Sequence, residues 1–129
     1  MKYLCLAYGS EAKFNALSKA QLDDLVARCA AYDAELQAGG HLISGMSLGW
    51  GATTLRLRNG KLSITDGPFA ATKEVVGGLI IIEARDLNEA IQVASLHPAA
   101  RMGEELGWGL EIRPIDEAPP CRPDRAAAS

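Results

Sequence analysis

The sequence predicts a single domain of mixed α+β fold. Short apolar runs typical of strands alternate with two segments of helical periodicity. Asn59 and Gly60, the strongest two-residue hairpin signal, lie between segments in which polar and apolar residues alternate. The chain of 129 residues is 48% hydrophobic, which is sufficient for one domain with a buried core. The predicted order is strand, helix, strand, hairpin, strand, helix, strand.

The first strand and the first helix follow from the N-terminal third. Residues 3–8 form a continuous apolar run, typical of a strand buried on both faces. Residues 9–17 are mostly small and polar, and we expect a loop. Ser18 and Gln21 fit a capping box at a helix start, and two glycines at 39–40 are typical of a helix end. A helix is therefore predicted over 18–38, with this apolar stripe: Leu22, Leu25, Val26, Cys29, Tyr32 and Leu36.

The sequence of residues 41–84 indicates strands and no helix. Residues 41–47 are typical of a strand, and glycines around Trp50 indicate a break. Alternation on both sides of Asn59 and Gly60 predicts a β-hairpin over 53–65. Residues 78–84, rich in β-branched side chains, predict the next strand.

The last third predicts a helix, a strand and a tail. Asp86 is an N-cap candidate, and Pro98 is expected to stop the helix that follows it. Residues 108–115 predict the final strand. Without the hairpin, the order is βαββαβ, the ferredoxin-like arrangement. The domain then spans residues 1–115, and the Pro/Ala-rich residues 116–129 are predicted to be a disordered tail.

The predicted sheet has more apolar surface than its helices can cover. Two helices cover one face of a four-stranded sheet, yet segments 3–8 and 79–82 are apolar at successive positions and so carry hydrophobic groups to both faces. A second copy of the chain is the simplest cover, because most oligomers are symmetric and a large exposed apolar sheet aggregates. We expect a homodimer in which two sheets face each other.

Composition excludes several functions. A net charge of −3 gives no basic field for nucleic acid or an anionic membrane, and no apolar segment is long enough to span a bilayer. Cys5, Cys29 and Cys121 have no metal-ligand spacing, so two buried thiols and one stray thiol are expected. The histidines His41 and His97 have no such spacing with the acidic residues either. We expect a cytoplasmic protein without metal or other cofactor.

One motif is specific enough to indicate a family. The sequence Thr-Asp-Gly-Pro-Phe at 65–69, followed by Thr-Lys-Glu-Val-Val-Gly-Gly at 72–78, resembles the DGPF subgroup of YCII-related proteins, and weaker matches extend the resemblance over residues 1–115. The resemblance implies a dimeric α+β barrel and, for some members, a link to extracytoplasmic-function sigma factors. Related proteins are suspected enzymes with a histidine on the first helix and an aspartate before a late proline. Here the first helix has no histidine, and His97 precedes Pro98.

The motif supplies four candidate site residues. A turn aspartate normally accepts the amide hydrogen two residues on, but Pro68 has none, so the Asp66 carboxylate is left for another donor, which is either its own loop or a ligand. Phe69 is a loop-locking aromatic or a pocket wall. Lys73 and Glu74 form either an exposed ion pair or an anion contact beside a proton-transfer group.

Other candidates lie later in the chain. His97 could move a proton near neutral pH, or it is a helix-end histidine whose charge the helix dipole favours. Arg113, with Glu83 and Glu111, lies on strands whose alternation directs these groups between facing sheets, as a dimer ion pair or a substrate clamp. Trp50 and Trp108 are flanked by glycines and are interpreted as packing residues first and pocket walls second.

Two classes of function fit these residues. The protein is a small-molecule binding or regulatory module, or it is a cofactor-free isomerase or lyase in which Asp66 or His97 moves protons and Lys73 holds an anion. We favour the module and keep the enzyme as the alternative. Convergence of Asp66, Lys73 and His97 on one pocket would favour the enzyme.

Overall fold

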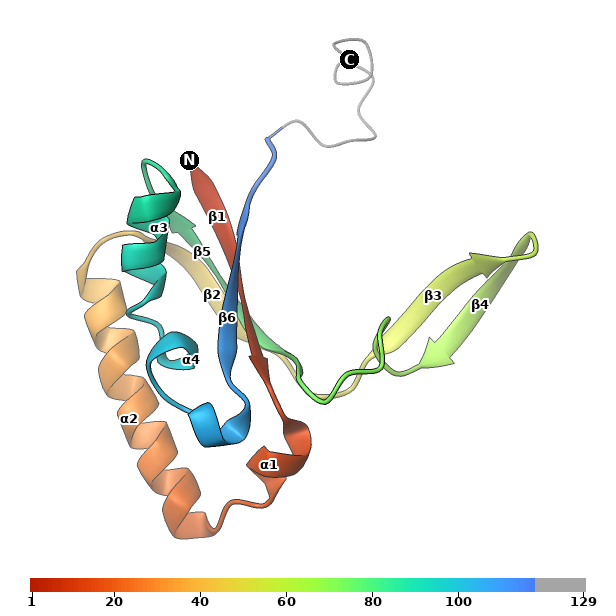
Figure 1. Ribbon diagram of the computed structural model, residues 1–129, viewed down its shortest axis with the longest axis horizontal. Helices are drawn as coiled ribbons and strands as arrows, with labels where there is room; N and C mark the ends of the chain where they lie inside the picture. Colours follow the sequence, from red (N-terminus) through yellow and green to blue (C-terminus); the bar gives the residue numbers. More distant parts are fainter. Residues whose placement is uncertain (118–129) are drawn as a thin grey trace.

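The computed structural model describes residues 1–117 and shows an antiparallel four-stranded sheet with helices on one face (Figure 1). The strand order is β2-β5-β1-β6, which is the ferredoxin-like order once the hairpin is set aside, so the predicted fold class is confirmed. Most of the tail predicted to be disordered lies outside the described residues. The sheet strands are β1 (Lys2–Gly9), β2 (Leu42–Ser47), β5 (Val75–Glu83) and β6 (Gly109–Pro114).

The predicted first helix is present as α2 (Lys19–Ala38). Ser18 caps it by accepting from the Gln21 amide while the Gln21 side chain accepts from the Ser18 amide, so the capping box is confirmed. The loop expected at 9–17 is wrong in part, because α1 (Glu11–Asn15) forms there. The Ser10 hydroxyl accepts from the Lys13 amide and starts this single turn, which polar composition alone did not indicate.

The second predicted helix is present as α3 (Leu87–Ala94), and a further helical turn that was not expected follows it. The α3 helix begins at Asp86, as expected, but it ends before Pro98 is reached. Pro98 instead occupies the first position of α4 (Pro98–Arg101), where its missing amide hydrogen costs nothing. A 3₁₀ turn, η1 (Glu104–Leu106), then leads into β6.

The core lies between the sheet and the helices. On the helix-facing side of the sheet, Cys5 and Ile82 are fully buried, and α2 contributes Leu36 at 2% exposure. Burial raises the pKa of the Cys5 thiol to about 11, so this cysteine is an inert packing residue, as expected. The predicted stripe of α2 is confirmed except for Val26, which is 59% exposed.

The opposite face of the sheet carries no helix, and we call it the open face. Leu4 and Leu6 of β1 lie opposite Ile81 and Leu79 of β5, and all four are half-buried. The open face is therefore apolar, and the prediction of hydrophobic groups on both faces of these strands is confirmed.

The predicted hairpin is also present, and we call residues 53–66 the arm. It consists of β3 (Thr53–Arg58) and β4 (Lys61–Asp66) in a separate two-stranded sheet. Asn59 and Gly60 have φ of 50° and 76°, the left-handed backbone that a two-residue hairpin turn requires. The arm projects away from the sheet on the side opposite the helices (Figure 1).

Candidate functional site

A cavity of about 690 Å³ lies between α2 and the helix-facing side of the sheet. This volume is within the range of small-molecule sites, roughly 300–1,000 Å³. Its floor is made by residues with little or no side chain, contributed by three strands: Ala7, Gly9, Gly45, Gly77 and Gly78.

The glycines explain why the space is open. A Cβ at Gly45 would lie 3.0 Å from Ile80 Cγ2, and one at Gly78 would lie 3.1 Å from the Met46 carbonyl oxygen. Larger side chains at these positions would displace neighbours and fill the cavity. The sheet packs against α2 in the core, but around Gly45 and Gly78 a hollow remains between them.

Aromatic rings form the walls at one end of the cavity. Phe14 and Trp50 line it with their ring centroids 5.8 Å apart, and Trp108 lines it beside them. The Trp108 ring packs directly on Gly103, whose φ is +77°. The Trp50 ring lies 3.8 Å from where a Cβ at Gly9 or Gly77 would be, so both tryptophans are packing residues beside glycine, and both also line the cavity.

His97 is a half-buried polar group in the cavity wall. Its Nδ1 accepts the Ala99 amide hydrogen at 3.0 Å and caps the start of α4. In the neutral ring the proton is therefore on Nε2, which remains available as a donor. Burial lowers the pKa of His97, and the negative charge of Asp33 partly opposes this shift.

The helix-end interpretation of His97 needs a correction. His97 follows the C-terminal end of α3, where its amide donates to the Ala94 carbonyl oxygen, but its ring caps the N-terminal end of α4. There an amide hydrogen points at the ring and disfavours the imidazolium. The neutral ring is thus the form that this environment stabilises.

Asp33 is a site residue that the sequence analysis missed. Its exposed carboxylate lines the cavity rim from α2, on the same helix face as Cys29, Leu36 and Gln37, which line the cavity too. Spacings of three and four residues from these neighbours were the signal that could have indicated it. The position remained unnoticed because an acidic residue on a helix is usually only solvated.

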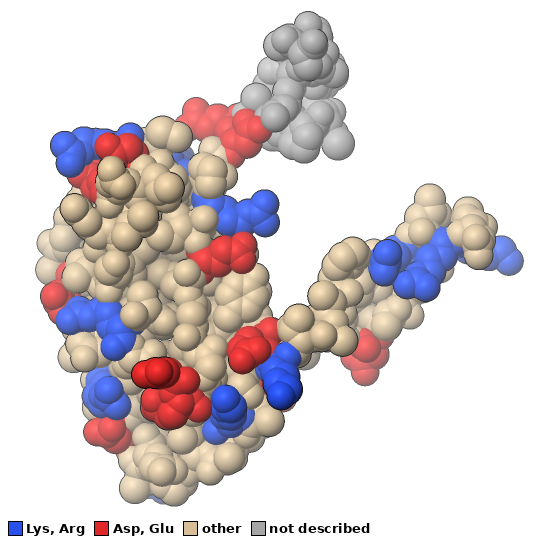
Figure 2. All heavy atoms as spheres, viewed as in Figure 1, with Lys and Arg blue, Asp and Glu red and all other residues tan. Residues whose placement is uncertain are grey.

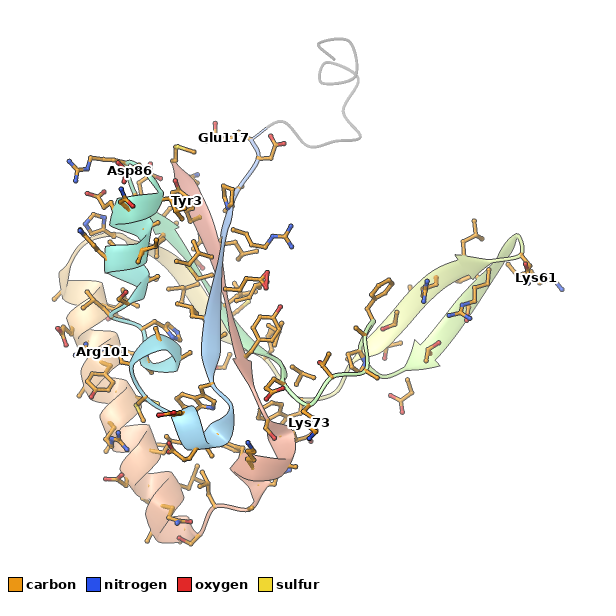
Figure 3. The ribbon with its side chains drawn as sticks, in the orientation of Figure 1. Tyr3, Lys61, Lys73, Asp86, Arg101 and Glu117 are labelled. Carbon is orange, nitrogen blue, oxygen red and sulfur yellow. The ribbon has the colours of Figure 1, made fainter. Side chains whose placement is uncertain are left out.

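An external clamp holds α4 against α2. The Arg101 guanidinium lies 4.1 Å above the Tyr32 ring and donates to Glu35 Oε2 at 2.7 Å (Figure 3). Both partners belong to α2, as does Asp33. This contact fixes His97, four residues before Arg101, relative to the Asp33 carboxylate.

The predicted residues of the motif lie elsewhere. Asp66 ends the arm, and its carboxylate makes no hydrogen bond or ion pair within residues 1–117. The nearby Thr72 hydroxyl donates to the Glu74 carbonyl oxygen at 2.6 Å rather than to Asp66. Phe69 is 72% exposed. The Arg56 guanidinium carbon lies over its ring, 4.7 Å from the ring centroid.

Lys73 and Glu74 link the arm to the domain. Lys73 is exposed where the chain returns from the arm (Figure 3), and the Glu74 side chain packs beside Gly107, its Oε1 3.1 Å from where a Cβ would be. Of the site residues expected from the sequence, only His97 lines the cavity. Within a single subunit, the structure therefore does not bring Asp66, Lys73 and His97 together.

Arg113 belongs to a polar cluster on the open face. It lies opposite Leu4 in the register, and Glu111 lies opposite Leu6. The Tyr8 hydroxyl donates to Glu111 Oε2 at 3.2 Å. Burial and this carboxylate raise the pKa of Tyr8, whereas Arg113 acts in the opposite direction. Glu83 pairs instead with the N-terminal ammonium at 2.9 Å.

The described part of the chain offers neither a metal-binding cluster nor a membrane-spanning helix. Within residues 1–117, no three His, Cys, Asp or Glu side chains are grouped so that they could hold a metal ion. None of the helices in that span has the length and apolarity needed to cross a membrane.

Comparison with known proteins identifies the family. The model of the YCII-related domain matches residues 1–115. The chain belongs to the YCII-related family. An uncharacterized protein of Rhizobium meliloti (strain 1021) is 31% identical over 117 residues, which cover 89% of this chain and 92% of that relative.

A solved structure is also similar to this YCII-related protein. It is the 5-chloro-2-hydroxyhydroquinone dehydrochlorinase TftG of Burkholderia phenoliruptrix AC1100, in complex with 2,5-dihydroxybenzoquinone. The identity is 17% and the TM-score 0.47, over 92% of this chain and 96% of the other.

Proposed function

We infer that this protein binds a small, flat organic molecule in the cavity between α2 and the sheet, and acts as a ligand-binding or accessory module. The observation that carries the proposal is a cavity with aromatic walls into which one partly buried histidine is built. Apolar walls with few polar groups are typical of small-molecule sites. The flat rings of Trp50 and Trp108 suit a planar ligand.

His97 defines the chemistry that the ligand must offer. With Nδ1 occupied by the Ala99 amide, the neutral ring presents only an N–H donor. The matching ligand group is an acceptor such as a carbonyl or phenolate oxygen. The Asp33 carboxylate at the rim repels a negatively charged ligand group beside it. The acceptor oxygen of the ligand is therefore expected to lie next to His97 rather than next to Asp33.

The alternative function is a cofactor-free enzyme. The specific observation in its favour is that Asp33 and His97 line the same cavity, with the carboxylate acting on the pKa of the imidazole. A neutral imidazole donor can polarise a substrate carbonyl while a carboxylate accepts a proton from the adjacent carbon. In the related proteins described above, the histidine lies on the first helix and the aspartate precedes a late proline. Here Asp33 lies on the first long helix, and His97 precedes Pro98.

The motif residues remain part of the proposal as ligand contacts contributed across an assembly. Asp66, Phe69, Lys73, Glu74 and Arg113 lie on the arm, on its return segment or on the open face. A second copy of the chain covering the open face would enclose Arg113 and its cluster. A sigma-factor-linked partner, implied by the family resemblance alone, also stays a proposal.

A fragment screen tests the binding function. Planar aromatic ketones and phenols are screened by thermal shift and their affinities measured by calorimetry. We expect hits whose affinity falls in Cys29→Phe, which fills the cavity from α2, but not in Val26→Phe, an exposed position on the same helix. Loss of the His97 donor in His97→Asn should cost about 1 kcal/mol, roughly fivefold in affinity.

The outcomes separate the competing sites. Hits that bind Cys29→Phe as tightly as wild type would contradict the cavity. Hits that are lost only in Asp66→Ala would place the site at the motif instead. Turnover of a bound ketone, abolished in Asp33→Asn and His97→Asn, would favour the enzyme over the module.

A further inference from the structure

The arm carries an apolar face that nothing in its own subunit covers. In its register Leu55 lies opposite Ile64, and Leu57 lies opposite Leu62, so all four side chains share one face. Their exposed fractions are 60%, 68%, 76% and 64%, respectively. Two-stranded hairpins standing alone are marginally stable in water, and a contiguous apolar patch of this kind marks an association surface.

The arm is held away from its own domain by contacts at its base. The Gly67 amide donates to the Ala52 carbonyl oxygen at 2.8 Å, and the Thr54 hydroxyl donates to the Gly67 carbonyl oxygen at 2.7 Å. Arg56 also stacks over Phe69 on the return segment. These contacts close the base and fix the direction in which the arm leaves the sheet, so folding back to cover its apolar face would require breaking them.

Charge indicates what kind of partner fits the arm. Residues 53–66 contain three basic side chains and one acidic side chain, whereas the rest of residues 1–117 contains eight basic and fourteen acidic side chains. The basic groups run along the arm (Figure 2). Arg56, Arg58 and Lys61 lie on the face opposite the four apolar residues, so they would stay at the edge of a contact that the apolar face makes. The body of this same chain is acidic and has apolar patches, so it fits both the apolar face and these flanking basic groups.

The shape of the subunit points to the same partner. The arm and the body enclose an open concave space on the side of the molecule away from the helices (Figure 2). The open face of the sheet, apolar through Leu4, Leu6, Leu79 and Ile81, borders this region. One partner seated there would contact the open face and the arm together.

We propose that the arm packs its apolar face on the body of a second copy of the chain, and that each subunit receives the arm of the other. Two-fold symmetry makes the exchange reciprocal. The exchange brings Asp66 and Phe69, which lie outside the cavity of their own subunit, against the other subunit. The inference rests on the homodimer and adds to it the role of the arm.

Hydrogen–deuterium exchange of the wild-type protein, combined with sedimentation at matched concentrations, tests the proposal. We expect a dimer at micromolar concentration in which the amides of residues 55–64 are protected, and we expect this protection to decline as dilution dissociates the dimer. A dimer with unprotected arm amides would overturn the arm exchange and leave the dimer standing. A monomer throughout would overturn both.

A pair of charge substitutions provides the matched comparison. Leu57→Asp places a carboxylate on the apolar face and is expected to weaken dimerisation at least tenfold and to abolish arm protection. Thr65→Asp adds the same charge to the other face of the arm and should leave both unchanged, since Thr65 pairs with Thr54 on that face. Equal dimerisation in wild type and Leu57→Asp would contradict the proposal.

Discussion

At the residue scale, the chemistry of the cavity depends on one imidazole whose protonation state is set by its surroundings. Burial removes water from His97, and the Ala99 amide occupies Nδ1, so the neutral ring with hydrogen on Nε2 is stabilised. Asp33 moderates this effect from the rim. A donor that stays neutral at physiological pH is suited to holding an acceptor oxygen.

His97 gives a pH dependence of stability with a definite sign. Because its pKa is lowered from the ordinary 6.5, the unfolded chain binds the proton more tightly than the folded one. Its contribution to stability is present above about pH 6.5 and is lost as the pH falls through the lower folded pKa. Urea unfolding at pH 7.5 and pH 5 should show a larger loss for wild type than for His97→Asn, which keeps a capping side chain.

Equal losses of stability in the two proteins would contradict this assignment. If His97→Asn loses as much stability as wild type over this pH interval, the folded protein does not favour the neutral imidazole. The donor role assigned to Nε2 would then fail.

Gly103 supports the cavity wall through Trp108. Its φ of +77° is strained for any other residue, and a Cβ would collide with the Trp108 ring. We expect Gly103→Ala to lower the free energy of unfolding by about 3 kcal/mol, from backbone strain and overpacking together. Gly49→Ala, where a Cβ would meet no atom, is the control. Equal stabilities of the two variants by denaturant titration would contradict this account.

The sequence predicted the residues that cap α2 and α3, but it did not predict which side chains meet at the cavity. His97, Trp50 and Trp108 could be singled out because their residue types are rare in this chain and are flanked by proline or glycine. Asp33 could not, because the chemistry of a helical carboxylate depends on which residue faces it across the cavity. The motif at 65–78 was conspicuous in sequence, yet its position relative to the cavity depends on the direction of the arm.

At the element scale, local signals determined where helices and turns begin. The capping box of α2 and the turn at Asn59 and Gly60 form as expected, since each depends on hydrogen bonds between near neighbours. The single turns α1 and α4 were missed, because a helix of four or five residues has no periodicity to detect. Pro98 was expected to stop a helix, but α3 already ends at Ala94, and Pro98 instead begins α4.

The cap of α2 offers a direct test at this scale. Ser18→Ala removes the acceptor of the Gln21 amide and is expected to lower the free energy of unfolding by about 1 kcal/mol. Ser18→Gly should cost only a few tenths of that, because glycine tolerates the capping backbone. Thermal denaturation of the two variants measures the difference, and an Ala variant as stable as wild type would show that the capping box contributes nothing.

At the scale of the whole molecule, sheet and arm pose the same problem of uncovered apolar surface. The two-sided hydrophobicity of β1 and β5 was readable from their continuous apolar runs, and the open face confirms it. The direction of the arm was not readable, because it depends on the contacts at Ala52, Thr54 and Gly67. We attribute both uncovered surfaces to one missing neighbour, a second copy.

A substitution on the open face tests the assembly independently of the arm. Leu6→Asp places a second carboxylate opposite Glu111 on the face that the partner would cover, so dimerisation should weaken at least tenfold. The monomer should keep its fold, since the helix-facing core is untouched. Val26→Asp on the exposed side of α2 is the control. Light scattering that finds Leu6→Asp and wild type equally dimeric would contradict association through the open face.

We propose above that the cavity between α2 and the sheet holds a flat molecule whose acceptor oxygen meets His97 Nε2. Nitrogen-detected NMR of the histidine side chains, recorded while a screened aromatic ketone is titrated, addresses it most directly. We predict a neutral His97 with hydrogen on Nε2 whose Nε2 signal shifts on binding in wild type and Val26→Phe but not in Cys29→Phe. A ketone that binds while the His97 signals stay unchanged would contradict the claim.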